Sequence, residues 1–312
     1  KYIVTGIGSS EAHARYLLYL LKTYHKDISA EFVPSSGCLN AKSKQTTLIV
    51  ISQGLSPNIR PVLESYNYQD MIVFTSVSSK NKSLQKRTIL EKLKEGGCLL
   101  VRYPLEDEYT TLIRTIGPLV GYGAIYESIS TKSYHSTSLD LFSLLTKVKD
   151  DLPNIKFMES LGKCSRVCFL LSYPLGEFFQ NIIYKFTEGA FVSSVQTSDY
   201  LSFAHGVFQN IEHQKKNNRD TCFISIINSD FDRSMASHVD ALLDERYPVW
   251  KLSTSLPAEL SILYFEMIFN YFILDYIKNK DIDQTSWQGM DRQDIIYNLS
   301  SKNEILDKTD TL

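Results

Sequence analysis

Two short, hydroxyl-rich segments of this sequence are suited to binding a phosphate group. Each follows a β-branched apolar run and precedes a helical stretch; they read Gly6-Ile7-Gly8-Ser9-Ser10 and Ser52-Gln53-Gly54-Leu55-Ser56. A tight turn between a strand and a helix presents backbone N–H groups at the helix N-terminus, where anions bind. Hydroxyls and an amide, without a lysine cluster, suit one phosphate monoester better than a polyphosphate. The residues that we expect to hold this phosphate are Gly8, Ser9, Ser10, Ser52, Gln53 and Ser56.

A dinucleotide-binding turn is the obvious alternative for the first segment. That fingerprint requires a third glycine where this chain has Glu11, and a bulky acid would crowd a pyrophosphate and repel its charge. It also requires an acid at the end of the second strand, where residues 32–34 read Phe-Val-Pro. A simpler alternative stays open, because Ser10 and Ser56 could cap their helices, and capping engages the same backbone donors.

The elements that position these residues alternate regularly between strand and helix. After the first strand at residues 2–5, apolar β-branched runs predict strands at 30–33, 48–51, 71–75, 99–101, 167–171, 222–227 and 249–252. Apolar residues at helical spacing predict helices at 12–21, 84–93, 109–125, 139–148, 177–186, 233–243 and 260–277. This alternation predicts an α/β fold with parallel sheets covered by helices on both faces, in three αβα layers.

The two halves of the chain follow the same plan. Residues 98–125 and 247–274 each contain a short strand, then a proline, then an acid-bearing apolar helix. We therefore expect a tandem duplication of one α/β unit, with the join near residues 149–161. This gives a first domain at 1–150, which holds the phosphate-binding loops, and a second domain with a C-terminal tail at 151–312. Two unrelated α/β domains remain the alternative.

Composition excludes several classes of partner. The 312-residue chain has a net charge of −2 and a pI near 6.4, so we expect it to bind neither nucleic acid nor an anionic membrane surface. The apolar stretch at 260–277 is interrupted by Glu266, Asn270 and Asp275, at spacings that a bilayer would penalise. We therefore expect a buried helix there and no membrane span.

Cysteine and histidine usage predicts neither a disulfide framework nor a metal site. The five cysteines are scattered and odd in number, which fits a protein of the reducing cytoplasm. The histidines are dispersed without ligand spacing, so no metal or other cofactor is expected.

The pairing of these two segments resembles the sugar isomerase (SIS) domain, in which the corresponding loops hold the phosphate of a phosphosugar. The duplicated layout resembles double-SIS proteins such as the isomerase half of glucosamine-6-phosphate synthase, over essentially the whole chain. The resemblance implies two tandem flavodoxin-like, or Rossmann-like, domains and a small-molecule sugar phosphate as partner. By similarity, Ser9 and Ser10 belong to the first phosphate loop, and Ser52, Gln53 and Ser56 to the second.

The resemblance also implies catalytic residues in the second half. Lys185-Phe186-Thr187-Glu188 is similar to the family's Lys-x-x-Glu, which makes Glu188 the residue that moves a proton between adjacent sugar carbons through an enediol. Phe203-Ala204-His205-Gly206 is similar to the family's Lys-His-Gly-Pro, whose histidine opens the sugar ring and reaches the neighbouring subunit. The resemblance therefore implies a symmetric homodimer.

Two departures from the family pattern leave the activity open. The family's second loop usually reads Ser-Gln-Ser-Gly-Glu-Thr, whereas Gly54 follows Gln53 directly here, so one hydroxyl is missing. The synthase also has a lysine shortly after its Asp-Val-Asp-Gln, and residues 285–290 contain none. We expect a phosphosugar isomerase or deglycase that acts on a hexose 6-phosphate or its amino derivative. A non-catalytic phosphosugar sensor is the alternative, and an α/β protein of unrelated function is a weaker one.

Overall fold

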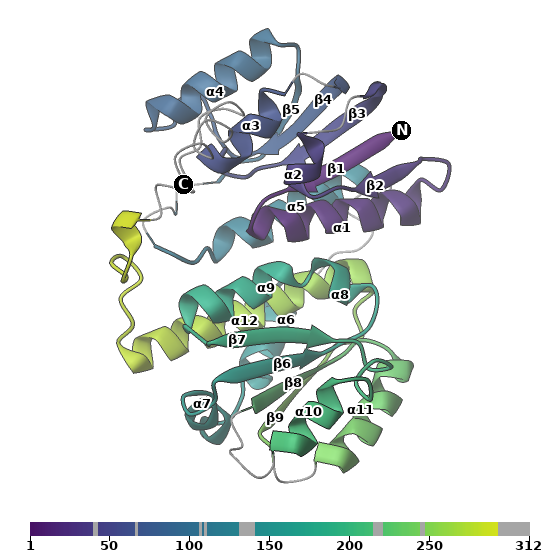
Figure 1. Cartoon of the computed structure of the whole chain (residues 1–312), viewed down its shortest axis with the longest axis vertical. Helices are drawn as coiled ribbons and strands as arrows, with labels where there is room; N and C mark the ends of the chain where they lie inside the picture. Colours follow the sequence, from purple (N-terminus) through teal and green to yellow (C-terminus); the bar gives the residue numbers. More distant parts are fainter. Residues whose placement is uncertain are drawn as a thin grey trace. The chain divides into compact units, whose positions relative to one another are not determined.

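The chain forms two compact units, residues 1–133 with 285–312 and residues 134–284. The computed structural model describes residues 1–39, 43–65, 68–105, 108, 111–130, 141–214, 221–243 and 247–292. Each unit contains one parallel sheet, so the predicted α/β class with parallel sheets is confirmed (Figure 1).

The first unit is built on a five-stranded parallel sheet with the order β2-β1-β3-β4-β5. Its strands are β1 (Tyr2–Gly6), β2 (Ala30–Phe32), β3 (Ser43–Ile51), β4 (Tyr68–Thr75) and β5 (Leu99–Arg102). The central strands are apolar on both sides, as strands covered on two faces require. In β3, for example, residues 48–51 are all buried.

Helices cover both faces of this first sheet (Figure 1). On one face lie α1 (Ser9–Tyr24) and α5 (Ile116–Ile129), which pack against each other. On the other face the core joins residues of the sheet to short helices and to α4 (Leu84–Glu95). The short helices are α2 (Ser35–Cys38), the 3₁₀-helix η1 (Pro57–Ile59) and α3 (Arg60–Leu63).

The second unit is built on a four-stranded parallel sheet with the order β7-β6-β8-β9. Its strands are β6 (Arg166–Leu170), β7 (Ser194–Ser198), β8 (Thr221–Ile227) and β9 (Val249–Ser253). On one face, α10 (Val207–Gln214) and α11 (Asp230–Leu243) cover a core that includes Phe203 and Phe223.

The opposite face of the second sheet carries a densely aromatic core. Phe169, on β6, contacts Phe179, Phe186 and Phe269 with ring centroids 5.1–5.6 Å apart, at the edge-to-face angles that aromatic pairs prefer. The helices on this face are α8 (Leu175–Phe178), α9 (Gln180–Tyr184), the π-helical turn η2 (Lys185–Gly189) and α12 (Ala258–Lys280). Two further helices precede β6, namely α6 (Leu141–Asp150) and α7 (Ile155–Leu161), and a 3₁₀-helix, η4 (Met290–Arg292), follows α12.

The long apolar helix α12 meets the length and composition of a membrane span, which for one helix is weak evidence. Two-thirds (67%) of its most apolar window is buried inside the protein. Glu266 and Asn270, which interrupt the apolar run, are buried and bonded to Lys185. The predicted buried helix is therefore confirmed, with bounds three residues beyond those predicted at its C-terminal end.

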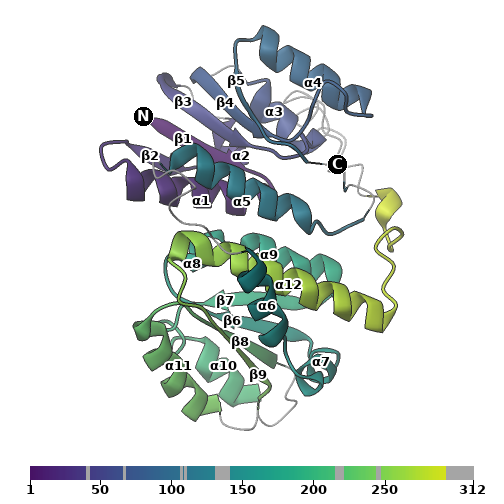
Figure 2. The ribbon, with the colours of Figure 1, turned by 180° about the vertical axis from the view of Figure 1, so that it is seen from behind.

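Several predicted bounds of helices, strands and domains are wrong. Helix α5 begins at Ile116, seven residues later than predicted, because the Glu108 carboxylate accepts hydrogen bonds from the N–H groups of Thr115 and Gly117 and caps it there. Strand β3 begins at Ser43, five residues earlier than predicted. Helix α6, assigned from sequence to the first half, packs on α12 in the second unit (Figure 2).

Candidate functional site

The two predicted phosphate loops follow neighbouring strands in the first sheet. Strands β1 and β3 pair in register, with Gly6 opposite Ile51, so both strands end at the same level. Helix α1 leaves β1 toward one face of the sheet, whereas η1 and α3 leave β3 toward the other. A crevice opens where the connections diverge in this way, and in sheets of this strand order it is where ligands bind. The structure therefore places both loops at the topological switch point.

The first loop needs its glycines to make the turn from β1 into α1. A methyl group at Gly6 would lie 2.3 Å from the Ser10 carbonyl oxygen, so only glycine permits this close approach of strand and helix. Gly8 adopts a φ of 59° and is the residue that precedes the first turn of α1. Ser9 and Ser10 are the first two residues of that helix.

Part of the donor set at the start of α1 is already engaged. The Ser10 N–H donates to the Ile7 carbonyl at 3.2 Å, and the Glu11 N–H donates to the Gly8 carbonyl at 2.9 Å. Among the described residues, the N–H groups of Gly8 and Ser9 have no acceptor. This loop can therefore offer two backbone N–H groups and two hydroxyls to an anion.

The serine hydroxyls of both loops are not used for capping. The side chains at the starts of α1 and η1 make no capping hydrogen bond, although Ser56 occupies the N-cap position before Pro57. Within the part of the chain that the structure describes, no hydrogen bond engages the hydroxyls of Ser9, Ser10, Ser52 or Ser56. Four hydroxyls at one sheet edge are thus left to bind a ligand.

The backbone of the second loop is anchored to the adjacent strand. The Ser52 N–H donates to Phe74 O at 3.0 Å. The Gln53 carbonyl accepts from the hydroxyls of Thr75 and Ser76 at 3.0 and 2.8 Å, and from the Ser76 N–H at 2.9 Å. The sequence analysis missed this third hydroxyl-bearing segment after β4, although a strand followed by small polar residues was the signal that identified the other two loops.

The Gln53 side chain lies against the start of α5. A methyl group at Gly117 would lie 2.0 Å from Gln53 Nε2, so the glycine provides the space for this amide. The Gln53 side chain is almost fully buried. The second loop continues into η1 and α3, which together span only seven residues, so its helix dipole contributes less than that of α1.

A buried histidine lies one turn behind the first loop. Nδ1 of His13 lies 3.0 Å from Ser9 O, and Nε2 lies 2.9 Å from Pro118 O on α5. Its ring contacts the Tyr122 ring at 4.1 Å, and Gly121 makes room for it, since a methyl there would lie 2.8 Å from Nε2. Because carbonyl oxygens only accept hydrogen bonds, both ring nitrogens must carry protons for both contacts to be favourable. In a neutral ring only one of the two nitrogens can donate, so the tautomer decides which carbonyl accepts the hydrogen bond.

The two predicted catalytic residues belong to the second unit. Glu188 is exposed on η2, whose π-helical bond runs from Ala190 N–H to Lys185 O at 3.3 Å. His205 is exposed in the turn between β7 and α10, followed by Gly206 at a φ of 94°. π-turns often occur at functional sites, because the extra residue redirects the side chains beside it.

Lys185, the first residue of the Lys-x-x-Glu segment, points into the core of the second unit. Its ammonium group pairs with Glu266 and donates to Asn270 Oδ1 at 2.6 Å, while Asn181 donates to the other carboxylate oxygen of Glu266. All four side chains are buried. This buried network fixes the start of the turn that carries Glu188.

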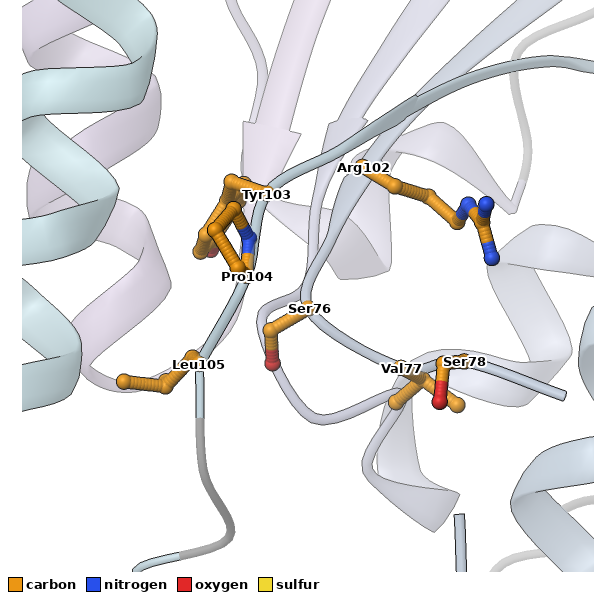
Figure 3. A pocket seen from close by; sticks show the side chains of 7 residues that line it. All are labelled: Ser76, Val77, Ser78, Arg102, Tyr103, Pro104 and Leu105. Atoms are coloured by element: carbon orange, nitrogen blue, oxygen red, sulfur yellow. The ribbon is translucent and has the colours of Figure 1, made fainter. Parts of the chain in front are cut away.

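A cavity of about 630 Å³ adjoins the second loop at the ends of β4 and β5 (Figure 3). It is lined by Ser76, Val77, Ser78, Arg102, Tyr103, Pro104 and Leu105. The hydrogen bonds between Gln53 O and Ser76 link the wall of this cavity to the predicted phosphate site. Its volume lies within the range of small-molecule binding pockets.

No protein-family model matches this sequence, and no curated protein is similar to it in sequence. Solved structures nevertheless share its fold. A tagatose-6-phosphate ketose/aldose isomerase from Escherichia coli superposes with a TM-score of 0.67 at 14% identity, covering 92% of this chain and 85% of that one. The C-terminal domain of glucosamine-fructose-6-phosphate aminotransferase from Francisella tularensis gives 0.64 at 11% identity, covering 91% and 86%.

A third structure extends this set of similar folds. Glucosamine-6-phosphate deaminase from Thermotoga maritima gives a TM-score of 0.63 at 15% identity, covering 91% of this chain and 87% of that one. Each alignment spans both parallel sheets of the present chain, because it covers more than nine-tenths of the residues. The chain therefore has the fold of these sugar-phosphate isomerase and deaminase structures.

Proposed function

We propose that this protein is a phosphosugar isomerase or deglycase of double-SIS type, acting on a hexose 6-phosphate or amino-sugar 6-phosphate through an enediol or enediolamine intermediate. One observation carries the proposal. Two loops with unengaged hydroxyls flank the switch point between β1 and β3. The names of the proteins that share the fold, a ketose/aldose isomerase among them, support the same substrate class.

The tandem SIS arrangement is part of this proposal. When the strands are numbered from the start of each unit, the second sheet has the order 2-1-3-4. This order matches the first four positions of the first sheet, 2-1-3-4-5. The final strand of each sheet, β5 or β9, also precedes a long apolar helix, although β9 corresponds to β4 in the strand order. These correspondences support one α/β unit used twice, as two SIS-type domains.

In this reaction, phosphate binding fixes the sugar, and Glu188 and His205 carry the proton transfers. Gly8, Ser9, Ser10, Ser52, Gln53 and Ser56 hold the phosphate. Binding energy from this non-reacting end orients carbons 1 and 2 of the sugar. Glu188 moves the proton between them, and His205 opens the ring in the site of the partner subunit of a homodimer. The five cysteines are free thiols, which supports a cytoplasmic location.

The phosphate site is tested by replacing Ser10 and Ser52 together with alanine. We expect the double variant to bind fructose 6-phosphate several kcal/mol more weakly in calorimetry, since each hydrogen bond to a charged group is worth about 1.5–3 kcal/mol. Ser128→Ala is the matched control, because this exposed helix serine donates to Ala124 O, away from both loops. Unchanged affinity in the double variant would remove the two loops from the proposal.

The catalytic role is tested with Glu188→Gln, which keeps the shape of the side chain and removes the base. We expect it to abolish deuterium incorporation at C2 of the sugar phosphate in D₂O, followed by NMR, while affinity stays within about 1 kcal/mol. Glu177→Gln is the control, because Glu177 is another exposed carboxylate that precedes Glu188 in the chain. This variant should leave the exchange intact. His205→Asn should slow the cyclic substrate far more than an open-chain analogue.

A sensor that binds phosphosugars without turning them over is the second candidate. The absence of a lysine at residues 285–290 and the single missing hydroxyl after Gln53 favour it. So does the engagement of Lys185 by Glu266, which leaves that ammonium group unable to assist a reaction. Tight binding of a sugar phosphate without any C2 exchange by the parent protein would establish this candidate instead.

A further inference from the structure

An unpaired arginine lines the cavity next to the predicted phosphate site. Arg102 is the last residue of β5, and its side chain is exposed. It has no ion pair within 4.0 Å in the described ranges, unlike Arg15 and Arg60, which pair with Glu11 and Glu64. An arginine without a carboxylate partner, at the wall of a cavity, is available to bind an anion from solution.

The neighbouring hydroxyls complete a set of donors. Figure 3 shows the Arg102 guanidinium and Ser78 on one side of the cavity, and Tyr103, Pro104 and Leu105 on the other. The Ser78 oxygen accepts from the Lys80 N–H at 3.3 Å, so its own hydrogen remains free to be donated. A guanidinium and a hydroxyl hydrogen together match the oxygens of a carboxylate or a phosphate.

The spacing of the strands places this second set of donors at a definite distance from the first. The switch point lies between β1 and β3, and β4 and β5 follow in the sheet. At about 4.8 Å between adjacent strands, the end of β5 lies roughly 12 Å from the switch point. A single extended sugar derivative can therefore reach both sets of donors.

We propose that the ligand is a sugar phosphate with a second anionic group, and that Arg102 with Ser78 binds this group at the ends of β4 and β5. The inference rests on the proposed function, because the first phosphate must occupy the loops at the switch point. It narrows the substrate class from hexose 6-phosphates in general to hexose 6-phosphates that also carry a carboxylate or a second phosphate remote from the first.

The test compares paired ligands on the full chain by calorimetry. Sorbitol 6-phosphate against 6-phosphogluconate isolates a carboxylate, because both are open-chain, and fructose 6-phosphate against fructose 1,6-bisphosphate isolates a second phosphate. We expect the parent protein to bind at least one doubly anionic ligand about tenfold or more tightly than its partner. Arg102→Ala should abolish this preference and leave affinity for the monophosphates within about twofold. Arg102→Lys should retain part of it, since it keeps the charge and loses the planar fork.

Lys94→Ala is the matched control, because it removes one exposed positive charge from the last turn of α4 in the same unit. It should leave the preference intact. Monophosphate binding without any preference for a second anion would overturn the inference and leave the proposed function standing. Equal effects of Arg102→Ala and Lys94→Ala would also overturn it, since only net charge would then matter. Failure of all four ligands to bind would overturn the proposed function, and this inference with it.

Discussion

At the scale of single residues, the His13 ring contacts two separate parts of the fold. Its two nitrogens face two backbone carbonyls, one four residues earlier and one on α5. Ser9 O, which accepts from Nδ1, belongs to the same peptide unit as the Ser10 N–H. The ring therefore connects the loop that we expect to bind phosphate to α5.

We expect the two carbonyl contacts to hold the His13 ring in a single protonation state, without exchange between the two neutral tautomers. Long-range ¹H–¹⁵N NMR of the imidazole ring distinguishes the imidazolium from either neutral tautomer. His238 is the internal control, because its Nδ1 lies 2.8 Å from Ser234 O in the same four-residue relation, but its side chain is exposed. Exchange of the His13 ring between the two neutral tautomers would contradict this expectation.

The sequence predicted the serines of the two loops but not the role of His13. The serines are recognisable because they directly follow apolar strands, and local sequence determines that pattern. Pro118 lies 105 residues beyond His13, so the contact between its carbonyl and the His13 ring exists only after α1 and α5 have packed. Thr75 and Ser76 show the same local pattern as the two loops, but their bonds to Gln53, which follows another strand, form only in the folded sheet.

At the scale of elements, α5 provides space for both parts of the site with two glycines one turn apart. Gly117 accommodates the Gln53 amide, and Gly121 accommodates the His13 ring. The helix therefore approaches α1 and the second loop more closely than alanine at these positions would permit. Gly123 lies on the same helix and meets no neighbour within 4 Å.

We expect Gly121→Ala to destabilise the protein by about 1–3 kcal/mol in urea unfolding, because the added methyl would overlap His13 Nε2. Gly123→Ala, on the same helix, should instead stabilise it by about 0.4–1 kcal/mol through the lower entropy of the unfolded chain. If both substitutions stabilise the protein, α5 does not pack against His13 as described. The pair of variants separates steric overlap from helix propensity.

The predictions at element scale succeeded where the pattern was strongly apolar and failed at polar elements. Strands β1, β3, β6 and β8 were predicted from apolar runs, and the structure confirms them within a few residues. Strand β7 (Ser194–Ser198) was missed because it is an edge strand with three exposed residues and no apolar alternation. The start of α5 was misplaced because its cap, Glu108, acts across seven residues.

At the scale of the whole molecule, each unit has its own core, and the second one contains a buried charge pair. Lys185 and Glu266 are almost completely inaccessible to solvent, with side-chain exposures of 3% and 0%. Removing one member of such a pair leaves the other charge buried without compensation, which costs about 3–5 kcal/mol. Replacing both with apolar residues avoids that cost.

We expect Lys185→Met to destabilise the second unit by about 3–5 kcal/mol, measured by urea unfolding together with hydrogen exchange. Amides of β6 and β8 should lose protection, while those of β1 and β3 keep it, because they belong to a separate core. The double variant Lys185→Met with Glu266→Leu should recover most of the loss. Equal loss of protection in both sheets would contradict the independence of the two cores.

The π-helical turn at Lys185–Gly189 has a consequence for how this helix responds to changes in length. Such a turn is what an α-helix forms when it absorbs a one-residue insertion without breaking. Deleting Thr187 would restore the α-helical pitch and turn every later residue by about 100° around the axis. Lys185, which precedes the deletion, would keep Glu266, whereas Glu188 would swing away from its present direction. The one extra residue thus sets the direction of the Glu188 carboxylate without changing the position of Lys185, which is bonded to Glu266.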